Sequence, residues 1–203
     1  MPSEQCACII ERIDQLNSED PHQELAGGAP VPYELLYSQR VSEWVRRLMP
    51  EASEALLIAA RGQHIQRWTI PREQYARNRQ GYLRWRETLK AFHGKTVGKL
   101  MWEAGYSDEA IQRVRMIMSK RQLPSDPDTQ TLEDALCLVF LETQFADLRK
   151  KTPDEKMAEV LRKTWKKMSA QAREAALRLP LGESERQLLA ETLGEDRGSV
   201  HSP

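Results

Sequence analysis

The sequence lacks the segments by which several classes of protein are recognised. No run approaches the ~18 consecutive apolar residues that a membrane-spanning helix needs. The N-terminus carries acidic residues and no long apolar core, which argues against a signal peptide. There is no glycine-rich phosphate loop, and no Gly-x-Ser-x-Gly elbow supports a serine hydrolase. We therefore expect a cytoplasmic protein that does not bind a membrane.

Cysteine, glycine and net charge are also scarce. The three cysteines, Cys6, Cys8 and Cys137, are odd in number, which indicates buried free thiols rather than a disulfide framework. Thirty Lys and Arg balance thirty Asp and Glu, so the chain has no overall charge with which to bind nucleic acid in bulk. Charged residues make up 30% of the chain and only 10 residues are glycine, a composition that indicates a helix-rich protein.

Helical spacing of apolar residues recurs along the chain. It predicts helices over residues 5–17, 33–49, 54–67, 82–103, 107–121, 131–150 and 153–179, and a short last helix from residue 184. Residues 18–32 read as a Gly/Pro-rich loop, and no segment alternates apolar and polar residues as a half-buried strand does. The predicted fold is all-α, a compact single-domain bundle of about seven helices over residues 1–180. A short helix and a frayed tail are expected over residues 181–203.

The positive charge is concentrated between residues 59 and 93. This stretch holds eight basic residues and only two acids, Glu73 and Glu87, a formal charge of +6. Its arginines are candidates for phosphate binding, because a guanidinium forks onto phosphate oxygens and stacks on aromatic rings. They are Arg61, Arg67, Arg72, Arg77, Arg79, Arg84 and Arg86. The helical period fails over residues 68–80, which predicts an ordered basic loop at the edge of a cleft.

Three aromatic residues accompany these arginines and are candidates for stacking on a base: Trp68, Tyr75 and Tyr82. Arginines and aromatic rings together can hold a nucleotide or an RNA backbone. The same arginines can instead pair with acids of other helices, including Glu133 and Asp134, in a purely structural network. The sequence leaves both interpretations open.

Two histidines and two acids from different predicted helices form a second candidate site. His64, His93 and Asp134 are candidate ligands of a divalent metal ion, because imidazole nitrogens and carboxylates hold such ions. Glu133 is the candidate catalytic residue that orients or deprotonates a metal-bound water. A structural interpretation is also available, since Asp134 follows Thr131 at the spacing of a helix-capping box.

The motifs themselves resemble a known family. They are AARGQHIQRWTIPR, GYLRWR, FH, GY, QTLEDALCLVFLE and KTWKKMS, the last of which the periodicity places mid-helix. In order and spacing, over roughly residues 5–180, they resemble the domain-of-unknown-function family 4202. That family has no settled activity, so this resemblance brings no reaction to the chain.

More distantly, the layout resembles the HD domain, an all-helical superfamily of metal-dependent phosphohydrolases. In that superfamily a histidine on an early helix is followed by a His-Asp pair, a further histidine and a late aspartate. The corresponding positions here are Gln39, the pair Gln63-His64, His93 and Asp134. The resemblance implies an HD-like bundle, and Gln39 and Gln63 depart from the pattern at two ligand positions.

The function that we expect is binding of a phosphate-bearing small molecule such as a nucleotide. The HD resemblance implies its metal-dependent hydrolysis, in which a divalent ion would lower the pKa of a bound water toward ~7. The arginines would then stabilise the negative charge of the phosphate. The alternative is a non-catalytic helical module. Its polar residues would form a structural network, and its basic loop would bind RNA or a protein.

Overall fold

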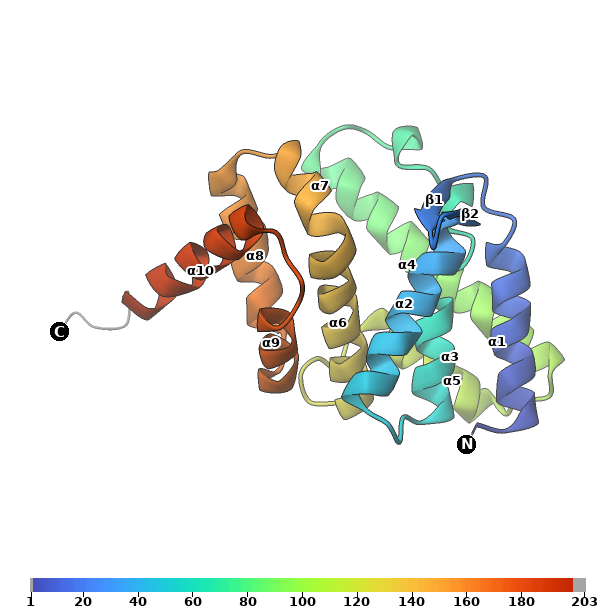
Figure 1. Cartoon of the computed structure of the whole chain (residues 1–203). Helices are drawn as coiled ribbons and strands as arrows, with labels where there is room; N and C mark the ends of the chain where they lie inside the picture. The colour runs from blue at the N-terminus through green and yellow to red at the C-terminus, as the bar shows by residue number, and fades with distance from the viewer. Residues whose placement is uncertain (1, 199–203) are drawn as a thin grey trace. The chain divides into compact units, whose positions relative to one another are not determined.

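A computed structural model describes residues 2–198, with side chains as far as residue 193, and this part of the chain is mostly helical (Figure 1). The all-α prediction is confirmed in its main point. The described residues form ten α-helices, more than predicted, and one two-stranded sheet. The chain divides into two compact units, residues 1–132 and residues 133–203. The predicted domain of residues 1–180 stays a prediction.

The first unit contains two strands and the first helices. They are α1 (Glu4–Asn17), β1 (Gln23–Ala26), β2 (Ala29–Pro32), α2 (Tyr33–Leu48), α3 (Glu54–Gly62), α4 (Arg79–Glu103), α5 (Asp108–Ser119) and the start of α6 (Pro127–Val139). Ser3, Ser53 and Ser107 begin α1, α3 and α5, because each side-chain oxygen accepts the backbone N–H three residues on, at 3.1, 3.1 and 3.3 Å. Local capping thus sets three of the helix starts.

The hairpin of β1 and β2 corrects the prediction that residues 18–32 form only a loop. The two strands are antiparallel and joined by Gly27 and Gly28, whose φ angles are 59° and 84°. Two successive residues with positive φ make the tight turn that matches strand twist, and glycine adopts it without steric cost. The hairpin leads directly into α2, where Arg40 pairs with Glu24 of β1 at 2.7 Å.

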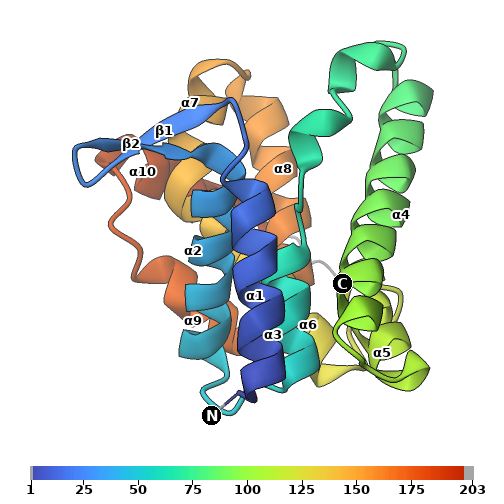
Figure 2. The same cartoon turned by 90° about the vertical axis from the view of Figure 1, so that its right-hand side faces the viewer.

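Helices α1, α2 and α3 lie side by side, and α5 lies beside the C-terminal part of α4 (Figure 2). Buried aliphatic side chains fill this unit, and each contributes ~1.5–3 kcal/mol by leaving water. Among them are Ile9, Ile13, Val41, Val45, Leu56, Ile58, Met101 and Ile117. Gly62 permits a close approach of α3 to α4, since a Cβ there would lie 2.5 Å from Val97 Cγ2.

The segment between α3 and α4 is not α-helical over residues 68–78, as predicted, whereas residues 79–80 of the predicted loop belong to α4. Helix α3 ends at Gly62 rather than at Arg67, and Gln66, with a left-handed φ of 49°, keeps the following turn from continuing as a helix. Two short 3-10 turns follow, Arg67–Thr69 and Arg72–Gln74. Figure 2 shows the segment rising past the end of α3 and returning to the start of α4. Asn78 caps α4, which therefore begins at Arg79, three residues before the predicted start.

The second unit contains the rest of α6, a π-helix over Phe140–Gln144, and four further helices. These are α7 (Phe145–Lys150), α8 (Asp154–Lys167), α9 (Ala170–Leu177) and α10 (Glu183–Gly198). The predicted helix over residues 131–150 begins earlier, at Pro127, and is interrupted by the π-helix. The predicted helix over residues 153–179 breaks because Met168 is extended and Ser169 caps α9. The Lys-Met-Ser run is therefore at a helix break and not mid-helix.

Three smaller expectations have mixed outcomes. Cys6 and Cys137 are buried free thiols as predicted, whereas Cys8 is exposed. No helix in the described part is long and apolar enough to cross a membrane. The predicted frayed tail begins within α10, which continues to Gly198, and residues 199–203 lie outside the described residues.

Candidate functional site

The two histidines predicted to share a site lie close together in the first unit. The ring centroids of His64 and His93 are 5.9 Å apart, His64 coming from the turn after α3 and His93 from α4. The close approach at Gly62 explains the pairing, because Val97, against which Gly62 packs, follows His93 by one helical turn. The His64 imidazole also stacks on Tyr37 of α2, with ring centroids 4.4 Å apart.

A buried acid that the sequence analysis missed, Glu34, lies against His64. It is in the first turn of α2 and only 5% exposed, and its backbone N–H donates to Asp20 Oδ2 at 3.0 Å. Its Oε2 is 3.2 Å from His64 Nδ1. A signal was present in the sequence, because Glu34 shares helical spacing with the buried residues Val41 and Val45.

Arg67 closes this group on its solvent side. Its Nη1 lies 3.1 Å from His64 Nε2, and its Nε lies 3.8 Å from Glu34 Oε1. The guanidinium also lies over the ring of Trp85, 4.8 Å from the ring centroid. The side chains of His64 and Arg67 are 19% and 29% exposed, so solvent reaches the group here. We call Glu34, His64, Arg67 and His93 the imidazole cluster.

The contact with Arg67 determines the tautomer of His64. A guanidinium carries only hydrogen-bond donors, so His64 Nε2 must accept, and the ring proton is assigned to Nδ1. Nδ1 then faces Glu34 Oε2 at 3.2 Å, although the two atoms are not aligned for a hydrogen bond. The imidazole is therefore a neutral ring between a guanidinium and a carboxyl group.

Burial also determines the charge of Glu34. Loss of water around the carboxyl group raises its pKa from 4.5 to about 8. The Arg67 guanidinium opposes this rise in the pKa, but its Nε is too far from Oε1, at 3.8 Å, for a direct hydrogen bond. Desolvation therefore dominates, and Glu34 is mostly protonated at neutral pH.

The two imidazoles are kept neutral by the same cause. Burial lowers the pKa of His64 well below 6.5, and three nearby cations lower it further: Arg67, Lys120 and Arg86. Burial also lowers the pKa of His93 to about 2, with His64 and Arg67 adding to the effect. At neutral pH the imidazole cluster holds one guanidinium and, with Glu34 mostly protonated, little carboxylate charge of its own, while Asp20 lies next to it and accepts the Glu34 backbone N–H.

Polar atoms without a partner gather at this place. Within the described residues, no hydrogen bond is made by Glu34 Oε2, Gln63 Oε1, His64 Nδ1 or His93 Nε2, all of them buried. Each such atom costs roughly 1–3 kcal/mol, and native proteins carry few of them. Beside Arg67 the structure thus concentrates buried polar atoms whose hydrogen-bonding capacity no described residue satisfies.

Two of the predicted phosphate-binding arginines serve the fold instead. Arg61 is 8% exposed, and its Nη1 lies 3.3 Å from Asp14 Oδ1. Arg72 donates to the backbone carbonyls of Tyr75 and Ala76, both at 2.8 Å. These contacts hold α1 to α3 and shape the segment before α4, which supports the structural interpretation for these two residues.

Three other arginines are available to a ligand. The side chains of Arg77, Arg79 and Arg84 are exposed and make no hydrogen bond or ion pair with any residue that the structure describes. Arg86 is engaged only at the surface, where it donates to the Tyr82 hydroxyl at 3.1 Å. Among the predicted phosphate-binding arginines, those without an ion pair in the described part of the chain therefore lie at the start of α4 and just before it.

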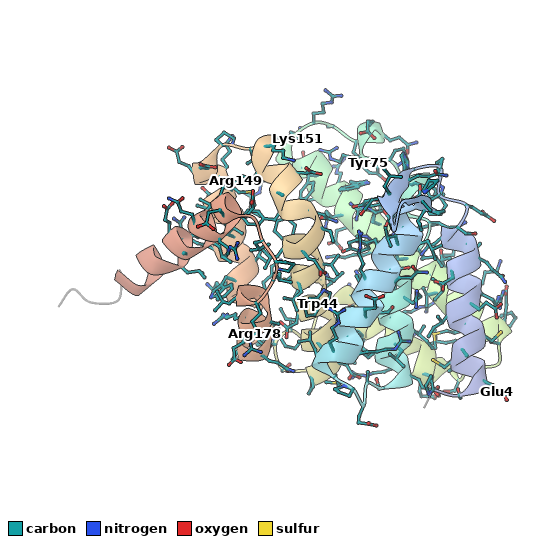
Figure 3. The ribbon with its side chains drawn as sticks, in the orientation of Figure 1. Glu4, Trp44, Tyr75, Arg149, Lys151 and Arg178 are labelled. Atoms are coloured by element: carbon teal, nitrogen blue, oxygen red, sulfur yellow. The ribbon has the colours of Figure 1, made fainter. Side chains whose placement is uncertain are left out.

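The three predicted stacking residues differ in exposure. Tyr82 is 42% exposed, and Arg86 lies over its ring at 5.8 Å from the centroid. Trp68 and Tyr75 are half-buried, and Figure 3 shows Tyr75 on the segment between α3 and α4. Of the three, Tyr82 offers the most accessible ring face.

The two predicted acids of α6 have partners inside the second unit. Asp134 Oδ1 accepts the backbone N–H of Ser169 at 2.8 Å, and Glu133 Oε1 lies 3.2 Å from Lys167 Nζ. Both contacts tie α6 to the break between α8 and α9. This supports the structural interpretation of the two acids, and their meeting with the histidines stays a prediction.

The side chains around His64 and His93 are poorly suited to holding a metal ion. Within the described side chains, no three His, Cys, Asp or Glu residues gather so as to hold one. In the imidazole cluster, Arg67 holds His64 Nε2 and the Glu34 carboxyl is protonated, whereas metal ligands must be unprotonated. The metal site of His64, His93 and Asp134 stays a prediction.

A family model described as "Domain of unknown function (DUF4202)" matches residues 7–189. The chain belongs to this family. The DUF4202 match includes every residue of the imidazole cluster and extends through α6, α8 and α9. It confirms the resemblance carried by the sequence motifs, while the HD resemblance stays a prediction. No curated protein and no solved structure matches the chain.

Proposed function

We propose that this DUF4202 protein binds a phosphate-bearing small molecule, such as a nucleotide, at the imidazole cluster. The observation that carries the proposal is the group of unpartnered polar atoms of Glu34, His64 and His93 beside the Arg67 guanidinium. A ligand that forms hydrogen bonds with these atoms removes the free-energy cost of burying them without partners, and it gains charge-assisted hydrogen bonds.

The chemistry of the atoms favours a phosphate monoester over a bare anion. Arg67 and protonated Glu34 donate to oxygens of an anion. His93 bonds the backbone of Gln63, which leaves its Nε2 as an acceptor for a ligand hydroxyl or amine. A nucleotide presents both kinds of group, phosphate oxygens and sugar hydroxyls.

The residues before and within the start of α4 support the same proposal. Arg77, Arg79 and Arg84 have no ion pair with any described residue, so their charge is available to further phosphates. The exposed face of Tyr82 is suited to stacking on a base. Inorganic phosphate would contact only the imidazole cluster, whereas a nucleotide would also contact these arginines and Tyr82.

Titration calorimetry of the full chain with phosphate, AMP, ATP and adenosine tests the proposal. Arg67→Gln should weaken AMP and ATP binding by about tenfold or more, because a hydrogen bond to a charged group contributes ~1.5–3 kcal/mol. Arg47→Gln is the matched control. Arg47 is exposed and roughly 20 Å along α2 from Glu34, and its loss makes the same charge change.

The proposal predicts no detectable binding of adenosine. Equal affinities of the Arg67 and Arg47 variants, or no binding of any phosphate compound at millimolar concentration, would overturn it. Circular dichroism of each variant checks that the fold is retained.

A hydrolytic form of the proposal, a metal-dependent phosphohydrolase of HD-like arrangement, is tested separately. The lowered pKa of His64 makes its imidazole a weak base at neutral pH, so the cluster supports binding better than catalysis. Phosphate release from the same compounds is measured with Mg²⁺ and with Mn²⁺. Release that both His64→Ala and Asp134→Ala abolish would establish hydrolysis, and no release under either ion would leave binding alone.

A further inference from the structure

A basic groove runs between α4 and α5 in the first unit. It has a volume of about 750 Å³, and its lining includes Lys90, Gly94, Lys95, Arg115 and Arg121. Lys95, Arg115 and a neighbouring glutamine also line an adjoining hollow of about 320 Å³ that extends to Trp102. We call the two together the α4–α5 groove.

Cations outnumber acids along this groove. The cations are Lys90, Lys95, Lys99, Arg115 and Arg121, and the acids are Glu87 and Asp108. The first and third lysines pair with glutamates of their own helix, at 2.7 and 3.7 Å. Lys95, Arg115 and Arg121 form no ion pair with any residue in the described part of the chain. Three cations are thus available to an anionic partner.

The Arg115 guanidinium is held in place by two glycines of α4. Its Nε donates to the Gly94 carbonyl at 3.1 Å. Its Nη2, Nε and Cζ would lie 2.5, 2.7 and 2.8 Å from a Cβ at Gly98, so the planar group rests over that glycine. Its terminal nitrogens donate to no described residue. An arginine fork held in this way loses little further freedom on meeting a phosphate.

We propose that the α4–α5 groove binds the phosphodiester backbone of a single-stranded nucleic acid. Lys90 and Lys99 are nine positions apart on α4, or roughly 14 Å, which is longer than one phosphate group needs. At one end the indole of Trp102 is 68% exposed and offers a face on which a base stacks. Cations along a groove with an exposed aromatic ring are the usual means of binding single strands.

This inference does not depend on the imidazole cluster. Arg67→Gln removes the proposed small-molecule site but touches no residue of the groove, so it should leave oligonucleotide binding unchanged. Failure of one proposal is therefore distinguishable from failure of the other.

A glycine substitution tests the position of the Arg115 fork. In Gly98→Ala the new methyl group displaces the end of the flexible Arg115 side chain, while alanine favours the helix. Arg178→Gln is the control, because Arg178 is an exposed cation of the second unit and lines neither part of the groove.

The assay is fluorescence anisotropy of labelled 12-nucleotide U and dT strands with the full chain at low salt. Gly98→Ala and Trp102→Ala should each weaken binding by about fivefold or more, as expected for loss of a held fork or a stacked base. Arg178→Gln should bind as the wild type does. Lys95→Gln should reduce the salt dependence by about one phosphate contact. Equal binding of U and dT identifies the phosphodiester backbone, and a preference for U identifies RNA.

Two results would overturn the proposal. One is an affinity of Gly98→Ala equal to that of the wild type, which would show that the position of the Arg115 fork is irrelevant. The other is competition by poly-glutamate as strong as competition by unlabelled oligonucleotide, which would assign the groove to an acidic protein partner.

Discussion

Replacing Glu34 by glutamine should remove the loss of stability that we expect of the wild type between pH 6.5 and 8. Burial raises the Glu34 pKa to about 8 in the folded chain, against 4.5 for an ordinary glutamate. Between these values the folded chain holds a proton that the unfolded chain has released. The stabilisation is complete below the lower value and is lost as the pH rises through the higher one.

The two histidines of the cluster act in the opposite direction. The pKa values of His64 and His93 are lowered from 6.5, so only the unfolded chain takes up these protons, and stability falls as the pH drops below about 6.5. The three groups together predict greatest stability near pH 6.5. Above it, the extra proton on Glu34 of the folded chain corresponds to ~1.4 kcal/mol per pH unit. The histidines are still half-protonated in the unfolded chain at pH 6.5 and offset part of this, which leaves a net loss of about 1 kcal/mol up to pH 8.

The assay is urea unfolding at half-unit steps from pH 5 to 8, followed by tryptophan fluorescence. A Trp165→Phe background restricts the signal to the first unit, which holds the other four tryptophans. Glu34→Gln should not lose stability between pH 6.5 and 8 and should gain up to about 1 kcal/mol from the two histidines, while keeping the acidic decline. Glu43→Gln, an exposed acid on the same helix, should keep the wild-type profile.

If the free energy of unfolding falls equally steeply above pH 6.5 in the wild type and in Glu34→Gln, the reasoning is refuted, because the group that loses the proton is then not Glu34. The reasoning is refuted equally if this fall in the free energy of unfolding is unchanged in Glu34→Gln but absent in Glu43→Gln.

Two further stability predictions follow from single contacts. Gly62→Ala should lower the free energy of unfolding, measured in urea, by ~1–3 kcal/mol, because its Cβ would lie 2.5 Å from the stiff Val97 side chain. Gly94→Ala, whose Cβ would lie 3.7 Å from its nearest neighbour, should not lower it. Asp134→Ala should lower the stability of the second unit by ~1–2 kcal/mol, measured by Trp165 fluorescence, because the Ser169 N–H loses its acceptor. Asp134→Asn keeps an acceptor oxygen and should retain most of that stability; a loss equal to that of alanine would contradict the assignment.

Local chemistry made much of the first unit predictable. Apolar residues at helical spacing located α1, α2 and α5 closely, and capping side chains such as Ser53 and Ser107 set helix starts through bonds three residues away. The basic segment before α4 was also recognisable, because Pro71 and the loss of apolar period interrupt the helix. These signals act within one or two turns of chain.

Other features carried a local signal that the pattern analysis did not use. The Gly27-Gly28 pair is a tight-turn signal, but the flanking strands are only four residues each, and burial alternates along β1 but not along β2. The break at Met168 lies inside a continuous helical period, and only the extended backbone there and the cap at Ser169 reveal it. Short strands and helix breaks are where periodicity is least informative.

The sequence by itself determined the helical class, the place of the positive charge and the presence of His64 and His93 within it. Only the tertiary structure decided which charges are available. Glu34 becomes a neutral acid, Arg61 pairs with Asp14, and Arg115 rests over Gly98 because of neighbours that come from other helices. Desolvation and pairing depend on distance in space, and a pattern along the chain records neither.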